Sequence, residues 1–258
     1  MSAPGGSDPG LWLADTDGPG TIRQLVSGSI PWLAWKPDGD RLVYLGDSGM
    51  ATIRAQGGSR PEPLLSGDPQ PALWTADDEI FVLRVDSTGH LVLRAVVATT
   101  GEQRDVLAEP GGNVQFPDLS PDGRWLAYVH RKGDGRAVEL VVRSWPSLEG
   151  RRVIATGALS GVAWGADGEL LYMDDREYPA DPRVMRVRID ATSGSADTPR
   201  ELFSGVMGGT RPLRSWDVTA DGQRFVALTD DPDDVEAVPP ATEIHVVLNW
   251  FTELRARP

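Results

Sequence analysis

The sequence predicts an all-β fold assembled from a repeated four-stranded unit. Its 258 residues include 29 glycines and 21 prolines spread along the chain, as expected for short strands joined by tight turns. A pair of apolar strands around an acidic turn recurs five times, with turn aspartates Asp38, Asp77, Asp122, Asp167 and Asp221 spaced 39, 45, 45 and 54 residues apart. Since no segment shows helical periodicity over about ten residues, this period predicts the blades of a β-propeller.

The turn residues explain why the hairpin forms. In the clearest copy, residues 116–128, Pro121 fixes φ at the second turn position and Asp122 can bond the backbone ahead of it. Gly123 then takes the left-handed conformation that closes a three-residue loop. Asp78 stands at this place in the second copy, where aspartate is one of the few side chains that tolerate that conformation. We therefore predict a structural role for the turn residues Asp38, Gly39, Asp77, Asp122, Gly123, Asp167, Gly168, Asp221 and Gly222.

Two further strands complete each unit. A short apolar pair followed by a small residue, and usually by glycine, recurs at 24–28, 63–67, 105–109, 152–157 and 201–205. In three copies this glycine lies ten residues before the next turn aspartate. Between this element and the hairpin lies a strand of alternating hydrophobicity, found at 91–97, 138–143 and 184–189. Four tryptophans recur near one position of the unit and are interpreted as core residues, namely Trp35, Trp74, Trp164 and Trp216.

The N-terminal part of the chain departs from the repeat. We expect residues 1–10 to be disordered and residues 11–258 to form one propeller domain, with five full repeats and a partial N-terminal blade. Residues 11–15 and 21–28 look like the third and outer strands of a blade whose inner hairpin is missing. Either the chain begins inside a blade of a longer protein, or 21–28 pairs with the last third strand, 244–250, and closes a five-bladed ring.

The repeat resembles a known family. Residues 120–128, SPDGRWLAY, resemble the PD40 repeat of TolB-like (WD40-like) propellers, and the resemblance extends over about residues 11–251. The ending EIHVVLNWFTEL, at 243–254, is similar to the C-terminal part of bacterial propellers attached to Ser/Thr kinases. These families imply a six-bladed ring that binds protein or ligand at its mouth, often outside the cytoplasm. The repeat is specific for the fold and weak for function, because propellers serve many roles.

Composition restricts the function classes. The formal charge of −13 repels phosphate backbones, so we expect no nucleic-acid partner. The chain has no cysteine, which excludes disulfides and cysteine-based zinc sites. The N-terminus lacks the basic and apolar regions of a signal peptide, and no apolar run is long enough for a membrane helix. As written, the chain is expected to be soluble and cytoplasmic, or extracytoplasmic if it is a fragment of a longer receptor.

We predict no catalytic residue, no metal site and no cofactor. The Gly-x-Ser-x-Gly string of serine hydrolases is absent. The three histidines, His90, His130 and His245, form no His-x-x-x-His pair. Acidic clusters at 15–17, 174–175 and 230–234 contain carboxylates that could bind Ca²⁺, but none matches an EF-hand loop. Solvated loop charge is the favoured interpretation of these clusters.

One face of the predicted blades is the candidate binding face. Because the chain reverses at every strand, the loops between second and third strands share a face with the loops that lead to the next blade. This face carries the long segments 173–183, 206–214 and 229–242, and long loops on a rigid scaffold are common binding sites. From loop position and residue type, we predict binding contacts from Trp32, His130, Arg131, Lys132, Arg176, Tyr178 and Arg211.

The sequence therefore favours a non-catalytic binding or scaffold propeller, with a protein or peptide partner at the channel face. It could be the sensor domain of a larger receptor. We expect no membrane insertion and favour a monomer. Two alternatives stay open: the gating propeller of a prolyl-oligopeptidase-like hydrolase, and a metal-dependent six-bladed hydrolase or lactonase.

Overall fold

The regular structure of this chain is antiparallel β-sheet. The computed structural model describes residues 9–14, 22–133, 135, 137–175, 182–204, 216–219, 224–229 and 243–248. These ranges contain one short 3-10 turn, η1 (Ala166–Gly168), and no helix that is long and apolar enough to cross a membrane. The chain divides into two compact units between Pro117 and Asp118, inside strand β11.

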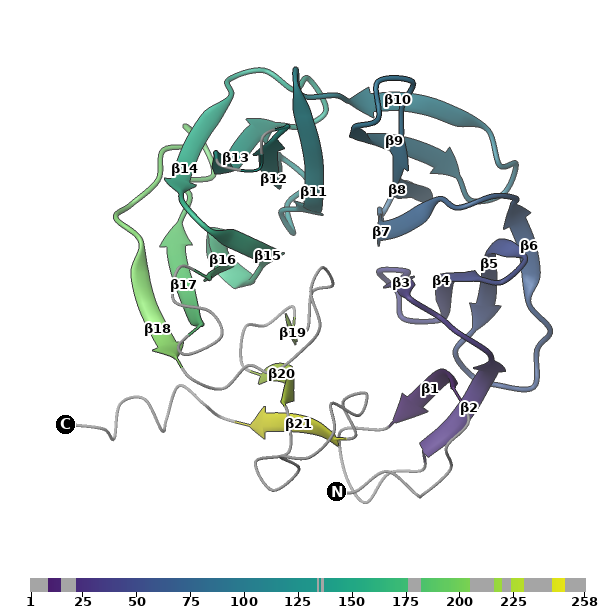
Figure 1. Ribbon diagram of the computed structural model, residues 1–258. Coiled ribbons are helices and arrows are strands. Elements are labelled where there is room, and N and C mark those ends of the chain that lie inside the picture. The colour runs from purple at the N-terminus through teal and green to yellow at the C-terminus, as the bar shows by residue number, and fades with distance from the viewer. Residues whose placement is uncertain are drawn as a thin grey trace. The chain divides into compact units, whose positions relative to one another are not determined.

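Before this division, three sheets follow one another in chain order (Figure 1). The first is a hairpin of β1 (Gly10–Ala14) and β2 (Ile22–Ser27). The second sheet consists of β3 (Trp32–Trp35), β4 (Arg41–Gly46), β5 (Gly49–Arg54) and β6 (Glu62–Leu65). The third consists of β7 (Gln70–Trp74), β8 (Glu79–Val85), β9 (Leu91–Val97) and β10 (Gln103–Leu107).

The later sheets have the same organisation. One consists of β11 (Gly112–Leu119), β12 (Trp125–Lys132), β13 (Val138–Ser144) and β14 (Arg152–Thr156). The next consists of β15 (Leu159–Trp164), β16 (Glu169–Asp174), β17 (Arg183–Arg188) and β18 (Arg200–Ser204). The last described strands are β19 (Trp216–Val218), β20 (Arg224–Thr229) and β21 (Glu243–Leu248).

In each four-stranded sheet, every strand pairs with the next strand along the chain, which is the organisation of a propeller blade. The predicted all-β propeller fold is therefore confirmed, with four complete blades among the described residues. The two partial sheets are β1–β2 and β19–β20–β21. The predicted pairing of 21–28 with 244–250 is absent from the described strands, in which β2 pairs with β1 and β21 with β20.

The turns between the first two strands of a blade follow the predicted chemistry. The Gly123 amide donates to the Ser120 carbonyl at 2.8 Å, and Gly123 has a φ of 67°. The Asp122 carboxylate accepts from the Arg124 amide at 3.1 Å, so it bonds the backbone ahead of it. Asp78 replaces glycine in the second blade and is left-handed, with a φ of 61°. Asp38 and Gly39 have the same arrangement as Asp122 and Gly123. Asp221 and Gly222 lie outside the described residues.

The turn at Asp167 differs from the prediction. Here both Asp167 and Gly168 are left-handed, with φ of 55° and 72°, and the turn is the 3-10 segment η1. The residue two positions before the turn aspartate is Gly165, which has no side chain to bond the loop. The Gly165 amide still donates to the Glu169 carbonyl at 2.8 Å, as the Thr75 amide does to the Glu79 carbonyl. The Asp-Gly pair thus forms a hairpin here through a different backbone conformation.

A hydroxyl two residues before the turn aspartate supports three of the hairpins. Ser120 Oγ accepts from the Trp125 amide at 3.0 Å and donates to Asp122 at 2.6 Å. Thr75 Oγ1 accepts from the Glu79 amide at 3.2 Å, and Thr219 Oγ1 accepts from the Arg224 amide at 3.0 Å. The hydroxyl satisfies an amide at the start of the second strand that the turn would otherwise leave without a partner.

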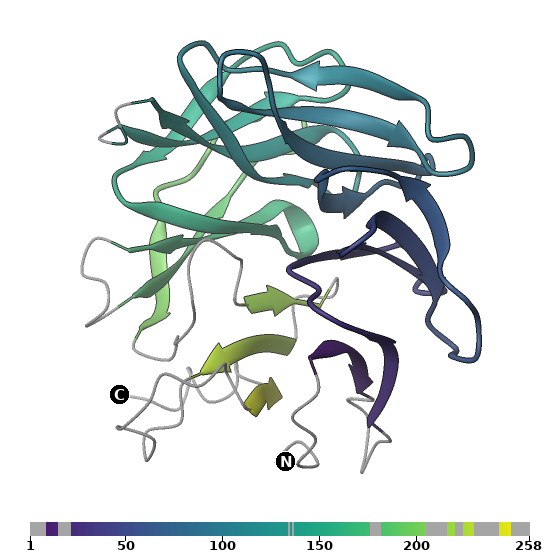
Figure 2. The same cartoon turned by 45° about the vertical axis from the view of Figure 1, so that its right-hand side comes forward.

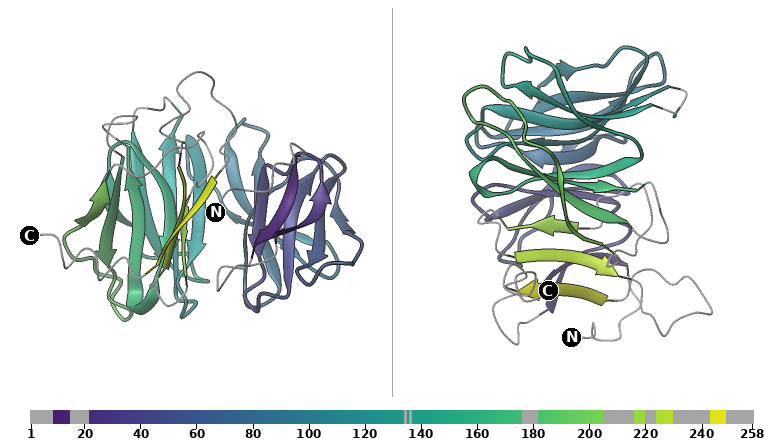
Figure 3. Two further views of the ribbon diagram at one scale, coloured as in Figure 1. Left: turned by 90° about the horizontal axis from the view of Figure 1, so that it is seen from below. Right: turned by 90° about the vertical axis from the view of Figure 1, so that its left-hand side faces the viewer.

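Apolar side chains fill the space between neighbouring sheets. Within the first unit, Trp74 of β7 packs in one cluster with Ala34 of β3 and Val43 of β4. A second cluster joins the β1–β2 hairpin to β4 and β5. Figure 3 shows the first strands of the chain, in purple, side by side. Within the second unit, the corresponding cluster contains Trp216 and Phe225, whose rings stack with centroids 5.2 Å apart. Trp74, Trp164 and Trp216 are buried as predicted, but Trp35 is 42% exposed.

One polar contact joins two neighbouring blades of the second unit. The Asp118 carboxylate, on β11, accepts from the Trp164 amide on β15 at 2.8 Å. The indole nitrogen of Trp164 also donates to the Asp118 carbonyl at 3.2 Å. We call these two hydrogen bonds from Trp164 to Asp118 the Asp118–Trp164 clasp. It fixes the height of one inner strand against the next, which apolar packing alone does not specify.

Candidate functional site

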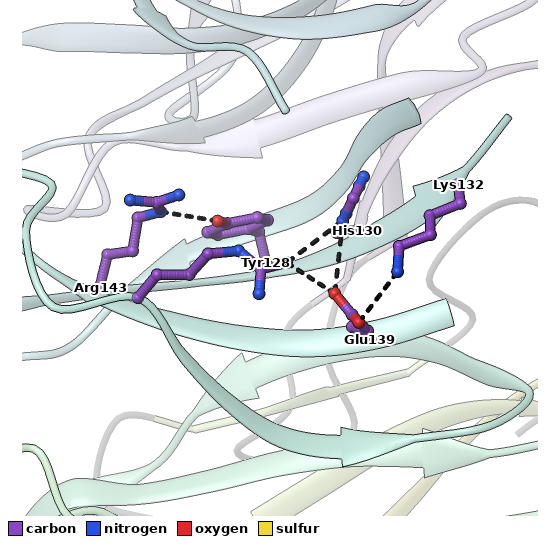
Figure 4. Close-up of polar contacts among 6 residues, drawn as sticks. Tyr128, His130, Lys132, Glu139 and Arg143 are labelled. Carbon is purple, nitrogen blue, oxygen red and sulfur yellow. Dashed lines mark hydrogen bonds and ion pairs between the residues drawn. The ribbon is translucent and has the colours of Figure 1, made fainter. Parts of the chain in front are cut away.

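The candidate site lies on the blade that contains β12 and β13. Alternate residues of a strand share one face, so β12 presents Tyr128, His130 and Lys132 together. His130 stands directly opposite Glu139 of β13 in the strand register. Six residues form what we call the Glu139 cluster, which Figure 4 shows: Tyr128, His130, Lys132, Glu139, Arg143 and Arg151.

Glu139 is the centre of this cluster, because each of its carboxylate oxygens contacts a different cation. The guanidinium of Arg151 donates to Oε2 at 2.6 Å. The ammonium of Lys132 lies 3.4 Å from Oε1. The hydrogen bond from Arg151, with the nearby charges, holds the pKa of Glu139 below its usual range. Glu139 therefore stays ionised and acts as an anchor for cations.

His130 lies beneath the surface, since only 3% of the residue is exposed. Its Nδ1 is 3.2 Å from the Arg151 guanidinium and 3.5 Å from Oε2 of Glu139. A guanidinium can only donate hydrogen bonds, so Nδ1 acts as the acceptor in the contact with Arg151. This contact favours the histidine tautomer that carries its proton on Nε2.

A second pair extends the cluster along the same face. The guanidinium of Arg143 donates to the Tyr128 hydroxyl and to the Leu148 carbonyl, both at 2.8 Å. The Tyr128 side chain is fully buried, so this bond satisfies a phenol that water does not reach. Arg143 and Tyr128 thereby stabilise the part of this sheet face that lies next to His130.

Exposure rises steadily across the cluster. The exposed side-chain fraction is 4% for His130, 17% for Glu139, 30% for Arg151 and 49% for Lys132. The partly buried carboxylate of Glu139 thus holds two cations whose outer parts face solvent. Such a group can present positive charge to a ligand in a fixed position, while the long Lys132 contact is weak enough to be exchanged.

Other buried ionisable residues lie at the corresponding end of their own blades. Besides His130, they are Glu109 after β10, Asp174 at the end of β16 and the adjacent Asp175. Asp175 accepts from the Ser160 hydroxyl at 2.5 Å, and its amide donates to the Ala158 carbonyl at 2.7 Å. We call this end of a blade the loop end, and the opposite end, with the Asp-Gly turns, the turn end.

Buried polar residues at the turn end are hydroxyls, such as Thr75 and Ser120. Charged groups are expensive to bury and are often retained for function, so their concentration at the loop end favours a site there. No group of three potential metal ligands occurs within the part of the chain that the structure describes.

The predicted site residues are only partly brought together. His130 and Lys132 meet at Glu139, with half-buried Arg131 between them on β12. Trp32 lies at the start of β3 and is half-buried, in the other unit of the chain. The remaining predicted contacts lie outside the described residues, namely Arg176, Tyr178 and Arg211.

Three members of the cluster were not predicted, namely Glu139, Arg143 and Arg151. The sequence does contain a signal for Glu139. If the strands on either side of residues 133–137 are paired as a hairpin, Glu139 stands opposite His130. Arg143 follows from the same alternation along β13. Arg151 precedes β14 and reaches Glu139 through the length of its side chain, which no sequence pattern indicates.

Solved structures share this fold at low sequence identity. A protein from Agrobacterium tumefaciens solved as TolB matches with a TM-score of 0.65 and 17% identity, over 88% of this chain and 79% of that chain. A puromycin-hydrolysing peptidase of Mycobacterium tuberculosis matches with a TM-score of 0.57 and 17% identity, over 81% of this chain and 37% of the peptidase. A periplasmic gluconolactonase of Pseudomonas aeruginosa matches with a TM-score of 0.53 and 15% identity, over 96% of this chain and 98% of the gluconolactonase.

A TolB from Acinetobacter baumannii also matches, and this chain spans 52% of its length. No protein-family model and no curated protein sequence matches the chain. At these identities the likeness concerns the fold, and the matched proteins include both TolB and enzymes. The chain is therefore a β-propeller that resembles TolB, as its PD40-like repeat predicts.

Proposed function

We propose that this chain is a non-catalytic propeller that binds a protein or peptide at the loop end of its blades. The observation that carries the proposal is the Glu139 cluster, in which a partly buried carboxylate holds Arg151 and Lys132 at graded exposure. An ion pair built only for stability gains little from such burial. A preorganised pair of cations supports recognition, because the partner need not order these side chains itself.

The partner segment should carry a carboxylate. The chain as a whole is acidic, with 38 Asp and Glu against 25 Lys and Arg, and the partly exposed cations Arg151 and Lys132 place positive charge at one point of the loop end. Lys132 is half exposed and 3.4 Å from Glu139. An incoming carboxylate could take over part of that interaction at little cost, because exposed ion pairs contribute only about 0–1 kcal/mol.

We further propose a six-bladed arrangement. It is supported by six separate sheets among the described strands, four complete and two partial. The match of residues 24–28 to the outer-strand repeat identifies β2 as the outer strand of its own blade. An experimental structure of the chain would test the count, and pairing of β2 with β21 would instead indicate five blades.

The binding proposal is tested by capture with matched variants. The purified chain and its Lys132→Ala/Arg151→Ala double variant are immobilised and exposed to extract from the native cells. Arg60→Ala is the control, since Arg60 is an exposed basic residue in the β5–β6 loop at the turn end. We expect a partner whose recovery falls at least about ten-fold with the double variant and is unchanged with the control. Equal recovery on all three would overturn the proposed site.

The non-catalytic part of the proposal has its own test. The purified chain is assayed with puromycin, aminoacyl-naphthylamides and gluconolactone, with and without added divalent cations. We expect no turnover above the uncatalysed rate. Turnover that co-purifies with the chain and disappears in a defined side-chain variant would instead establish a hydrolase or lactonase.

A further inference from the structure

The chain has two lysines, Lys36 and Lys132, and the structure places them in opposite surroundings. Lys36 follows β3 in the β3–β6 sheet, whereas Lys132 ends β12 in the β11–β14 sheet. Figure 2 shows these two sheets, the first in purple to blue and the second in teal. Chemistry directed at side-chain amines, such as acylation, therefore has two positions to choose from.

Lys36 is held as a cation by the carboxylates around it. Its Nζ donates to Asp38 and lies 3.7 Å from Oδ1 of Asp40, and 27% of its side chain is exposed. The hydrogen bond with Asp38 raises the pKa of Lys36, and the charges of Asp38, Asp40 and Asp78 raise it further. The neutral amine, which is the nucleophilic form, is therefore scarcer at Lys36 than in a free lysine.

Lys132 has one anionic neighbour among the described residues, and it shares that neighbour with another cation. Its Nζ lies 3.4 Å from Oε1 of Glu139, and 49% of its side chain is exposed. The other oxygen of this carboxylate accepts a hydrogen bond from Arg151 at 2.6 Å. The Lys132 backbone is fixed, because its amide donates to the Ala137 carbonyl at 2.9 Å. An exposed amine thus stands at a defined place, in long contact with a carboxylate whose charge Arg151 already balances.

The charges around the two amines also differ in sign. The groups that act on Lys36 are carboxylates, whereas Lys132 shares Glu139 with the guanidinium of Arg151. An anionic reagent is repelled by the first set of charges and attracted by the second. Acyl phosphates are activated acyl groups whose leaving group is such an anion. Exposure and the local field therefore both direct an acyl phosphate to Lys132.

We propose that Lys132 is an acylation site of this chain, selected over Lys36 by acyl phosphates, and that its acylation weakens partner binding at the Glu139 cluster. In this step the lone pair of Nζ attacks the acyl carbon, and a C–N bond forms. The bond from that carbon to the phosphate oxygen breaks, phosphate leaves with the electron pair, and the amine releases a proton to water. The product is a neutral amide without positive charge.

The rest of the cluster stays in place after acylation. Glu139 keeps its 2.6 Å hydrogen bond from Arg151, and the contact that is lost, with Lys132, is long and partly exposed. Stability therefore changes little, because exposed ion pairs contribute weakly. A partner carboxylate, however, loses one of its two positive groups. The effect on binding rests on the proposed function, whereas the selectivity for Lys132 does not.

Selectivity is measured with acetyl phosphate on the intact chain. Peptide mass spectrometry follows acetylation of each lysine, and the variants Lys36→Arg and Lys132→Arg give the rate of each amine by itself. We expect Lys132 to react at least about five-fold faster than Lys36, because exposure and charge act in the same direction. Salt at about 1 M should narrow the ratio, since it screens the neighbouring charges. Equal rates, or a faster reaction at Lys36, would overturn the acylation site.

The effect on binding is tested with the extract capture described above. Lys132→Gln copies the neutral product, and Lys132→Arg keeps the charge. Recovery of the partner should be at least about three-fold lower with Lys132→Gln and with the acetylated chain than with Lys132→Arg. Lys36→Arg is the matched control and should capture as the wild type does.

The outcomes separate the two proposals. Equal recovery with Lys132→Gln and Lys132→Arg would overturn the effect of acylation on binding, even if the Lys132→Ala/Arg151→Ala variant loses the partner. Failure of the wild-type chain to capture any partner would count against the proposed function, while the acetylation rates would still decide the acylation site.

Discussion

The two ends of a blade differ in how they use polar residues. At the turn end, a hydroxyl and an aspartate satisfy backbone amides, and the same arrangement recurs with Thr75 and Ser120. At the loop end, polar side chains bond chiefly to one another, as Glu139 does with Arg151 and Lys132. Where His130 faces Glu139, the other complete blades have different residue pairs, namely Gly46 and Gly49, Arg84 and Val92, and Asp174 and Arg183.

Under the proposed function, this difference separates residues that serve folding from residues that serve recognition. A repeated backbone-satisfying motif has to do the same work in each blade, namely to start the second strand after a tight turn. A cluster found in one blade does work specific to that blade, and its buried charges cost stability unless each finds a partner. Substitutions at the two ends should therefore differ in the size and the cause of their effects.

The largest effect is expected at the loop end. Glu139→Ala removes the carboxylate that holds Arg151 and Lys132 and leaves two cations near buried His130. The free energy of unfolding should fall by about 2.5 kcal/mol, because the charge-assisted hydrogen bond from Arg151 and the contact with Lys132 are lost together. Urea denaturation measures this, with Glu149→Ala as an exposed control on the same blade. A loss equal to that of the control would mean that the cluster is not anchored by Glu139.

Within the turn end, two glycines distinguish conformational strain from steric overlap. Both have positive φ, but a Cβ at Gly168 would lie 2.6 Å from the Ile189 carbonyl oxygen, whereas none lies within 4 Å at Gly123. Gly123→Ala should therefore cost about 1 kcal/mol from backbone strain alone. Gly168→Ala should cost about 2 kcal/mol because the backbone must also shift. Thermal unfolding checks the order, and equal losses would contradict a steric cause.

A smaller effect is expected from the repeated hydroxyl. Ser120→Ala removes an acceptor for the Trp125 amide inside a buried turn. Unfolding free energy should fall by about 1.5 kcal/mol, the usual cost of an unsatisfied buried donor. Ser120→Thr should restore most of it, since threonine holds this place at Thr75. If the threonine variant is as unstable as the alanine variant, the hydroxyl is not the stabilising group.

The smallest effect is a pH dependence of the loop end. The pKa of Glu139 is lowered from its ordinary value of 4.5, mainly by the hydrogen bond from Arg151. The stabilisation from its ionised form is thus present above that value and is lost as pH falls through the lowered pKa. Comparing wild type with Glu139→Gln from about pH 6 to about pH 3, we expect their difference in unfolding free energy to shrink as the pH falls. A constant difference would show that the pKa is not lowered.

Local signals made the fold predictable. The Asp-Gly turns, the outer-strand repeat and the alternation at 91–97 each depend on neighbours within a few residues, and each lies in the expected strand or turn. The turn at Asp167 was an exception, because both Asp167 and Gly168 are left-handed there, which the Asp-Gly pair by itself does not indicate.

Non-local features could not be predicted in the same way. His130 was chosen from its loop position, yet β12 continues through it and buries it on the blade face. Arg151 reaches Glu139 across twelve residues of sequence, so the contact depends on strand pairing and side-chain length together. Trp35 has the pattern of a core tryptophan, but its burial depends on whether the preceding blade supplies an inner hairpin.

The Asp118–Trp164 clasp has a consequence for how such a chain can change in length. The carboxylate stands four residues before turn residue Asp122, and Asp217 has the same position before the last turn. Duplicating a whole blade would preserve the spacing between carboxylate and turn, whereas inserting one residue within β11 would displace the donor from its acceptor by about 3.3 Å. Gain or loss of entire units is therefore the change in length that this contact tolerates best.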